Sequence, residues 1–285
     1  MRARLKLTGA AAAGMMALSL AAFCGAGAAR GEVSLRYDFY AGGFRVGTVE
    51  ADAELSEASY RANAVFRTEG WLEDLFDIDF AFAASGVSTD GNWTPSSFRS
   101  VYGGFEGNPV VLVDFGEGKV PVSATPAPPE GVMPDDVAER QHFIDPITAV
   151  LGEMARRDGA PCGRRLHLFD GIRTYTLVLE DAETDILEPT NEGSYAGASL
   201  RCAWHYELGR TGQGDWARDL FAETPPTGTI WFAHDPESGM TVPVKFLAET
   251  PVVSVVVHLM QADANGRAMT LGMAPAPADE GSSLE

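Results

Sequence analysis

Two cysteines in the second half of the chain are the residues whose chemistry is easiest to state. Cys162 and Cys202 would close a loop of about 41 residues, worth about 4 kcal/mol of stability in the chain-entropy model. In an oxidising compartment such a pair is typical of a structural disulfide. A redox pair is disfavoured because the C-x-x-C spacing is absent. We therefore predict a Cys162–Cys202 disulfide, with two buried free thiols as the alternative.

The other residues with reactive or metal-binding side chains show no recognisable pattern. The chain has no phosphate-binding loop, no dinucleotide-binding glycine motif and no H-E-x-x-H, and acidic clusters at 73–79 and 180–188 lack calcium-loop spacing. These clusters are typical of solvated sheet edges. The five histidines are isolated from one another: His142, His167, His205, His234 and His258. We therefore predict no catalytic residues, no metal site and no cofactor, and a protein that is not an enzyme.

One short segment concentrates apolar side chains between two expected strands. Trp71, Leu72, Leu75 and Phe76 fall within the sequence WLEDLF. Such a segment could cover the mouth of a cavity enclosed by a curled sheet. The alternative is ordinary core packing of a large sheet, and the sequence leaves both interpretations open.

The N-terminus has the pattern of a secretory signal peptide. Arg2, Arg4 and Lys6 precede an uncharged, largely apolar stretch, and small residues follow it. Ala26-Gly27-Ala28 fits the A-x-A rule, so we predict a signal peptide at 1–28 with cleavage near Ala28 and a periplasmic mature protein. The alternatives are an uncleaved anchor and a lipoprotein attached at Cys24, although bulky Phe23 precedes that cysteine.

The charge balance excludes one class of partner. The chain holds 40 Asp and Glu against 21 Lys and Arg, a formal net charge of −19. Removal of residues 1–28 would take away three basic residues and no acidic one, so the mature chain is more acidic still. Binding to nucleic acid or to an anionic lipid surface needs clustered cations. We expect neither, and no transmembrane segment in the mature chain.

Strand patterns dominate the remainder. Val33, Leu35, Tyr37 and Phe39 alternate with polar residues, as in a half-buried strand. A similar inward row runs over 200–208 and contains Cys202, Trp204 and Tyr206. Asp170-Gly171 predicts a hairpin with a type I′ turn. Gly42-Gly43 predicts another tight turn, and 242–246 is expected to pair with 252–260.

One helix is expected, over 145–157. Asp145 is a candidate N-cap and Pro146 fits the first helical position. Ile147, Val150, Leu151 and Met154 are spaced as one apolar face, and Arg156 and Arg157 would occupy the last turn.

Together these patterns predict a mainly β (α+β) fold. We expect a single large curved antiparallel sheet or open barrel with one packed α-helix. The predicted organisation is one β-rich envelope domain at 33–263, followed by a flexible C-terminal tail at 264–285.

Several of these segments resemble an exported bacterial family, domain of unknown function 3108. The similar stretches are residues 37–47, the helix opening at 145–151, Cys162-Gly163-Arg164 with the following 168–171 and Tyr175, Cys202, and the terminal hairpin containing Pro243. The resemblance spans roughly 35–262. It implies an exported, β-rich envelope protein, and it supplies no activity and no catalytic positions.

The leading functional hypothesis is non-catalytic binding of a hydrophobic or lipid-like envelope ligand. It follows from the apolar strand faces and from the segment at 71–76. A fold analogy with lipoprotein-localisation factors, which bind acyl chains in an open barrel, points the same way, but fold alone does not establish function. The alternative is an envelope assembly protein that binds a protein partner and no small molecule, and a hydrolase is the least favoured.

Overall fold

The computed structural model describes residues 31–70, 79–89, 92–103, 110–116, 121–125, 142–156, 161–211, 226–250 and 253–274. The predicted signal peptide at 1–28 and residues 275–285 lie outside this part. No helix in the described ranges is both long enough and apolar enough to span a bilayer.

One antiparallel sheet contains all the described strands, as the sequence predicted. Its main path runs β7-β6-β5-β4-β3-β2-β1-β13-β12-β11-β10-β9-β8, so β1 and β13 join the two halves of the chain. The strands are β1 (Gly31–Ala41), β2 (Phe44–Leu55), β3 (Tyr60–Thr68), β4 (Asp79–Thr89), β5 (Asn92–Tyr102), β6 (Val110–Phe115), β7 (Pro121–Thr125), β8 (Arg164–Phe169), β9 (Arg173–Leu187), β10 (Gly197–Thr211), β11 (Thr227–Asp235), β12 (Met240–Glu249), β13 (Ser254–Ala264), β14 (Arg267–Ala268) and β15 (Gly272–Met273).

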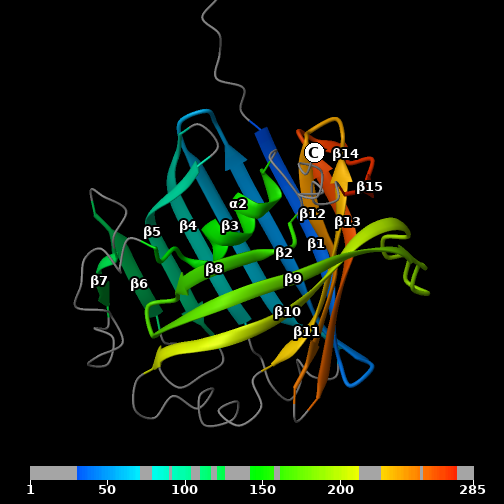
Figure 1. The fold of residues 1–285 in the computed structure, drawn as a ribbon, viewed down its shortest axis with the longest axis horizontal. Helices are drawn as coiled ribbons and strands as arrows, with labels where there is room; N and C mark the ends of the chain where they lie inside the picture. The colour runs from blue at the N-terminus through cyan, green and yellow to red at the C-terminus, as the bar shows by residue number, and fades with distance from the viewer. Residues whose placement is uncertain are drawn as a thin grey trace, which may run out of the picture.

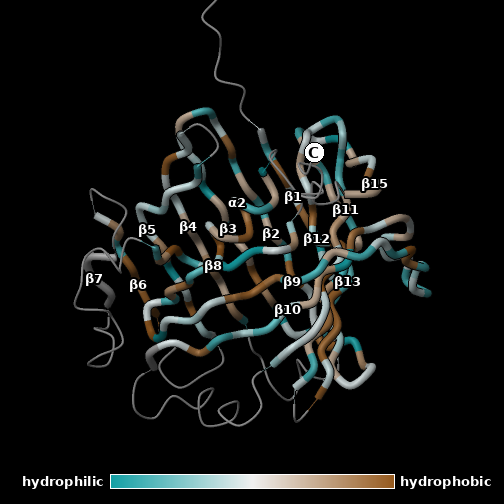
Figure 2. The backbone as a smooth tube through the Cα atoms, viewed as in Figure 1, coloured by the Kyte–Doolittle hydropathy of each residue, from teal (hydrophilic) through white to brown (hydrophobic). Residues whose placement is uncertain are grey.

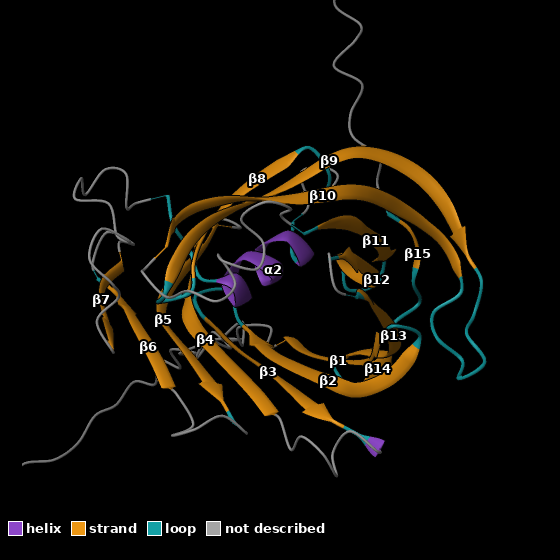
Figure 3. Ribbon diagram, turned by 90° about the horizontal axis from the view of Figure 1, so that it is seen from below, coloured by secondary structure: helices purple, strands orange, loops and turns teal. Residues whose placement is uncertain are grey.

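The sheet curls so strongly that β8–β10 cross in front of β3–β5 (Figure 1). Figure 3, seen from below, shows the strands surrounding helix α2 (Pro146–Met154). In the described residues the edge strands β7 and β8 are not paired with each other, so the curl is not a closed barrel. Instead, the β8–β9 turn packs on β6. A Cβ added at Gly171 would meet the Val111 side chain and lie 2.9 Å from Val113.

The β8–β9 hairpin forms where Asp170-Gly171 predicted it, but the type I′ assignment is wrong. Three residues, Asp170 to Ile172, separate the strands, and only Gly171 has a positive φ, at 89°. The Asp170 carboxylate accepts the backbone N–H groups of Ile172 and Arg173, both at 2.9 Å. This turn, closed by the Asp170 side chain, forms in place of the two-residue type I′ turn that an Asp-Gly dipeptide favours.

Helix α2 begins as predicted and ends early. Asp145 caps it and Pro146 is its first residue, but it stops at Met154. The predicted place of Arg156 in the last turn, beside Arg157, is therefore wrong; Arg156 instead lies 3.8 Å from Glu153. Leu151 and Met154 are buried in the core, whereas Val150 is 50% exposed, so the predicted apolar face is narrower than its spacing suggested.

The main core lies between α2 and the inner face of the sheet. The predicted inward positions Val33 and Leu35 belong to it, with Tyr60, Phe98 and Phe169. Figure 2 shows the apolar stretches of β6, β9 and β13 that help to form this interior. A second cluster surrounds Cys202 and Trp204.

The ordered chain continues past residue 264, where the sequence predicted the start of a tail. Strand β14 pairs with β13 and β15 pairs with β11. Ala274 is buried. The segment from β14 to Ala274 therefore returns to the sheet. A C-terminal tail remains a prediction only for the residues beyond 274.

Candidate functional site: an aromatic-lined interior

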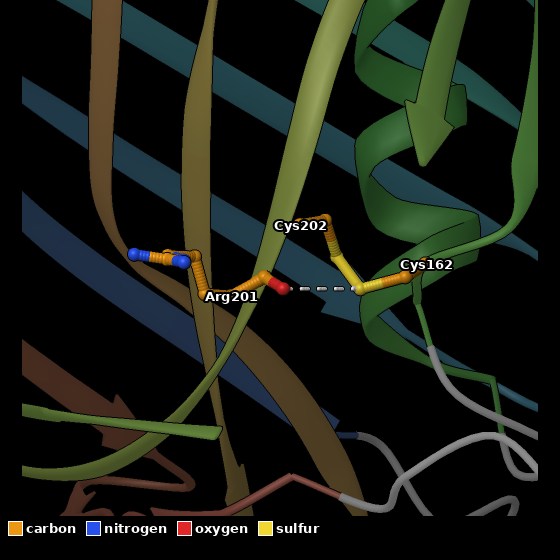
Figure 4. Close-up of a disulfide and its surroundings, with 3 residues drawn as sticks. All are labelled: Cys162, Arg201 and Cys202. Carbon is orange, nitrogen blue, oxygen red and sulfur yellow. Dashed lines mark hydrogen bonds between the residues drawn. A yellow bond between two sulfur atoms is a disulfide. The ribbon is translucent and has the colours of Figure 1, made fainter. Parts of the chain in front are cut away.

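The predicted disulfide is present and joins the helix exit to the sheet. Cys162 and Cys202 are bonded, with Cα atoms 5.5 Å apart. Cys202 lies on β10, and Cys162 follows α2 in the chain (Figure 4). The Cys162 sulfur also lies 3.8 Å from the Arg201 carbonyl oxygen. Both cysteines are buried, which suits a structural role.

The other predicted site residues, Trp71, Leu72, Leu75 and Phe76, lie outside the described residues. The two strands that this segment connects are described. β3 ends at Thr68 and β4 begins at Asp79. Phe66 and Phe80, close to those strand ends, are partners in the β3–β4 ladder.

Phe66 and Phe80 belong to a row of aromatic side chains on the inner face of β1–β5. Their rings stack with centroids 5.6 Å apart. Phe39 on β1 reaches Phe66 at 5.2 Å across Gly47 of β2, where an added Cβ would come within 2.9 Å of the Phe66 ring. At the other end Phe80 contacts Tyr102 of β5 at 5.6 Å, and Phe82 contacts the same tyrosine at 6.2 Å.

A second aromatic row lines β9–β12. Trp204 stacks on Phe246 with centroids 4.9 Å apart and meets Tyr206 edge-on at 5.1 Å. Tyr206 in turn contacts Tyr175 of β9 at 5.4 Å. Trp204 is fixed further because its indole N–H donates to the Leu247 carbonyl at 3.0 Å.

The two rows join through β13. Val257 of β13 is the direct partner of Phe39 on one side and of Phe246 on the other. We call the combined set the aromatic belt. Its members are Phe39, Phe66, Phe80, Phe82, Tyr102, Tyr175, Trp204, Tyr206 and Phe246.

The ends of the aromatic belt meet at the seam between the sheet edges. Tyr102 and Tyr175 are far apart along the strand order, yet the charge of an ionised Tyr102 would raise the pKa of Tyr175. Asp170 and Arg173, in and beside the β8–β9 turn, act on both tyrosines and on Tyr206. The Arg173 Nε donates to Asp170 at 2.9 Å. The aromatic belt therefore follows the inner face of the curled sheet. Its two ends lie on either side of the Asp170–Arg173 ion pair.

Helix α2 occupies the other end of the interior. The Thr148 hydroxyl donates to Asp145 at 2.5 Å and lies 2.6 Å from the Tyr60 hydroxyl. The Trp93 ring packs against Tyr60 at 5.2 Å. Tyr60, Asp145 and Thr148 are buried, whereas Trp93 and every belt member except Trp204 are only half-buried. The belt thus lies toward the end of the interior away from α2.

Two hollows outside the belt are polar. One of about 330 Å³ lies at the β11–β12 turn and includes Asp235, Ser238 and Arg267. The other, about 310 Å³, lies over β1, β2 and β13 and includes Arg36, Glu50 and Asp263. Neither offers an apolar wall like that of the belt. In the described ranges no three His, Cys, Asp or Glu side chains are grouped as metal ligands would be.

Sequence reasoning found part of this site. The predicted inward row over 200–208 is confirmed in part: Leu200, Cys202 and Trp204 are buried and Tyr206 is half-buried, but Leu208 is 37% exposed. The belt as a whole was missed because its contacts depend on the register of many strands. Aromatic residues near strand ends, such as Phe66 and Phe80, were the available signal.

Comparisons with known proteins show only distant similarity. No family model matches the chain, so its resemblance to domain of unknown function 3108 is not confirmed. No curated protein matches it either. A beta-barrel-like protein of domain of unknown function DUF1849 from Brucella abortus is 12% identical, with TM-score 0.44, over 82% of this chain and 98% of that one. A putative lipoprotein from Parabacteroides distasonis ATCC 8503 is 10% identical, with TM-score 0.31, over 82% of this chain and 95% of that one.

Proposed function

We propose that this protein is a non-catalytic binding protein that holds a hydrophobic or lipid-like ligand of the cell envelope against the aromatic belt. The observation that carries the proposal is a run of half-buried aromatic side chains round the inner face of the sheet, away from α2. Ligand sites are mostly apolar and aromatic, with few polar groups.

The energetics favour such a role over simple core packing. A fully buried aromatic side chain removes roughly 150–250 Å² from water. Phe66 and Phe80 gain only part of that in the protein alone. An apolar ligand would complete their burial and would be stabilised at about 25 cal/mol for each Å² removed from water.

We place this function in the periplasm, after cleavage near Ala28. The disulfide supports an oxidising compartment. Intact mass of the protein isolated from envelope fractions tests this directly. A mature N-terminus near residue 29 is expected, and a chain that begins at an acylated Cys24 would replace this proposal with a membrane-anchored lipoprotein.

Ligand binding is tested with the protein purified without detergent. Solvent extraction and mass spectrometry should recover an envelope lipid in stoichiometric amount. After delipidation, the protein should enhance the fluorescence of N-phenyl-1-naphthylamine, an apolar probe. Phe66→Ala and Phe80→Ala should each weaken this binding, and Phe66→Leu should restore much of it because it returns apolar volume.

Ile186→Ala is the matched control, since Ile186 is 73% exposed on β9 and lies outside the belt. It should leave probe binding unchanged. Recovery of no lipid together with no probe binding would overturn the proposal. In that case, crosslinking in cells that traps one defined protein would favour the envelope assembly role instead.

A further inference from the structure

The fold brings together two of the histidines that the sequence analysis treated as isolated. His142 precedes α2 and His167 lies on β8, and the centroids of the two imidazole rings are 6.4 Å apart. The Phe143 ring also meets the His167 ring, edge-on, at 6.1 Å. Nothing in the spacing of these residues links them, so only the folded chain shows the pair.

Residues 142–144 form a strap along the edge of β8. The Ile144 N–H donates to the His167 carbonyl at 3.0 Å, and the Phe169 N–H donates to the Ile144 carbonyl at 3.0 Å. Together the two bonds make an isolated parallel bridge. β8 is the last strand of the sheet path, so among the described residues this bridge is the backbone pairing on its outer edge. The strap leads directly into Asp145, the N-cap of α2.

The groups round His167 come from four elements. The strap contributes His142, and β8 contributes Arg165, which lies two residues before His167 and on the same face of the strand. β9 contributes Thr176, whose hydroxyl does not titrate and lies 3.0 Å from the His167 Nδ1. β10 contributes Glu207, the cross-strand partner of Thr176.

The two imidazoles change charge in mild acid, whereas the neighbouring ion pair does not. Arg165 donates to both carboxylate oxygens of Glu207, and this pairing holds the pKa of Glu207 below its ordinary value. His205 also contacts the Glu207 carboxylate, at 3.8 Å, but it lies on β10, which β9 separates from β8. The charge that acid adds beside the strap therefore falls on the two facing rings.

The surroundings of His167 make its protonation unfavourable while the strap is closed. Burial lowers the pKa of His167, and the positive charges of His142 and Arg165 lower it further, against the opposing effect of Glu207. The closed strap therefore binds a proton at His167 less readily than an open strap does. Its stabilisation by neutral His167 is full above the ordinary pKa of 6.5 and is lost as the pH falls below that value. Asp145 acts in the opposite direction, since burial raises its pKa to about 6.

We propose that the strap is a pH-sensitive latch, closed on β8 while His142 and His167 are neutral and opened in mild acid by repulsion between the two imidazolium rings. Opening frees the outer edge of β8 and the chain that leads into α2. This inference concerns a different part of the molecule from the aromatic belt and stands whether or not the belt binds a ligand.

Hydrogen exchange of the Ile144 and Phe169 amides in the purified mature protein tests the latch. Protection factors, which correct for the intrinsic effect of pH on exchange, should fall roughly threefold or more at both amides between pH 7.5 and pH 5. The Gly42 amide, which donates to the Ser254 carbonyl at 3.0 Å in another part of the sheet, is the internal reference and should keep its protection.

Glutamine variants connect this fall to the two rings. His142→Gln and His167→Gln should each abolish it, because glutamine does not take up a proton. The pKa of His167, measured by NMR titration, should also rise in His142→Gln, since the opposing charge is gone. His234→Gln is the matched control: the His234 Nδ1 lies 3.2 Å from the Thr241 hydroxyl, the same kind of cross-strand contact, and the strap should keep its pH dependence in that variant.

Three results would overturn the latch. Protection at Ile144 and Phe169 that is equal at the two pH values would do so directly. A fall of the same size in wild type and in both strap variants would show that the imidazoles are not its cause. A fall at Gly42 as large as that at Ile144 would mean that acid loosens the whole sheet rather than the strap.

Discussion

The carboxylate of Asp145 holds the hydroxyl of Thr148 at 2.5 Å and its backbone N–H at 2.8 Å, and both residues are completely buried. Thr148 also contacts the Tyr60 hydroxyl. One carboxylate therefore caps α2 and anchors it to β3. Among the described residues no cation contacts the Asp145 carboxyl group directly, so the ionisation of Asp145 is costly.

That cost predicts a pH dependence. Burial raises the pKa of Asp145 from 3.8 to about 6, while the hydrogen bonds from Thr148 act in the opposite direction. Between these two values the folded protein binds more protons at this site than the unfolded chain does. The contribution of Asp145 to the free energy of unfolding is therefore full below pH 3.8 and falls by about 3 kcal/mol as the pH rises through 6.

Urea unfolding of wild type and Asp145→Asn between pH 4 and pH 7.5 checks this contribution. Asparagine cannot ionise and is a good N-cap, so stability relative to wild type should increase for the variant as the pH rises. Asp145→Ala should be less stable than Asp145→Asn at every pH, by about 1 kcal/mol for the lost cap. A difference between wild type and Asp145→Asn that does not vary with pH would contradict the raised pKa.

The seam between the sheet edges gives a second prediction. Gly171 and Gly193 have nearly the same positive φ, 89° and 85°. An added Cβ at Gly171 would collide with Val111 and Val113, whereas at Gly193 it would meet nothing within 4 Å. Gly193→Ala should cost about 1 kcal/mol for backbone strain alone. Gly171→Ala should cost roughly 1–3 kcal/mol more from overpacking, as measured by denaturant unfolding.

Equal losses in the two alanine variants would mean that the β8–β9 turn is not pressed against β6. If the seam does open in Gly171→Ala, probe binding should also weaken, because Tyr102 and Tyr175 lie on its two sides. Gly193→Ala should not have this second effect.

The sequence predicted local features well and long-range ones poorly. Residue types that have few other roles in such positions predicted three features: the cap at Asp145, the turn at Gly42-Gly43 and the disulfide. The end of α2 was misplaced because Arg156 was assigned by its fit to the helix dipole, whereas the helix ends at Met154 and Arg156 lies 3.8 Å from Glu153, three residues earlier. The belt depends on registers such as Phe39 with Val257. No local pattern encodes partners that lie more than 200 residues apart.

An ion-pair network on the outer face supplies a third prediction. Asp38 is only 2% exposed, and Arg45 contacts both its carboxylate, at 3.0 Å, and that of Glu69, at 2.8 Å. Arg45→Met leaves the buried carboxylate without its nearest cation. Because the Arg45 side chain is 40% exposed, solvent screens part of the effect, and we expect a loss of about 1–2 kcal/mol.

Arg67→Met is the control for that variant. Arg67 pairs with Glu50 at the same 3.0 Å, but both side chains are more than half exposed. Such a surface pair should change the unfolding free energy by less than about 0.5 kcal/mol. Comparable losses in the two methionine variants would show that the burial of Asp38 has no energetic consequence.

The disulfide gives the last prediction. It closes a loop with a sequence separation of 40, so Cys162→Ala/Cys202→Ala should lower the free energy of unfolding by about 4 kcal/mol in the chain-entropy model. Alanine is preferred to serine because Cys202 is fully buried and a hydroxyl there would need a partner. Thiol titration of the unreduced, unfolded mature protein should first find neither cysteine free.

The bond joins the exit of α2 to the strand that carries Trp204 and Tyr206, so its loss should also loosen one wall of the belt. Probe binding in the double alanine variant, measured at a temperature where it remains folded, should therefore weaken; unchanged binding would show that the bond stabilises the fold without positioning the site.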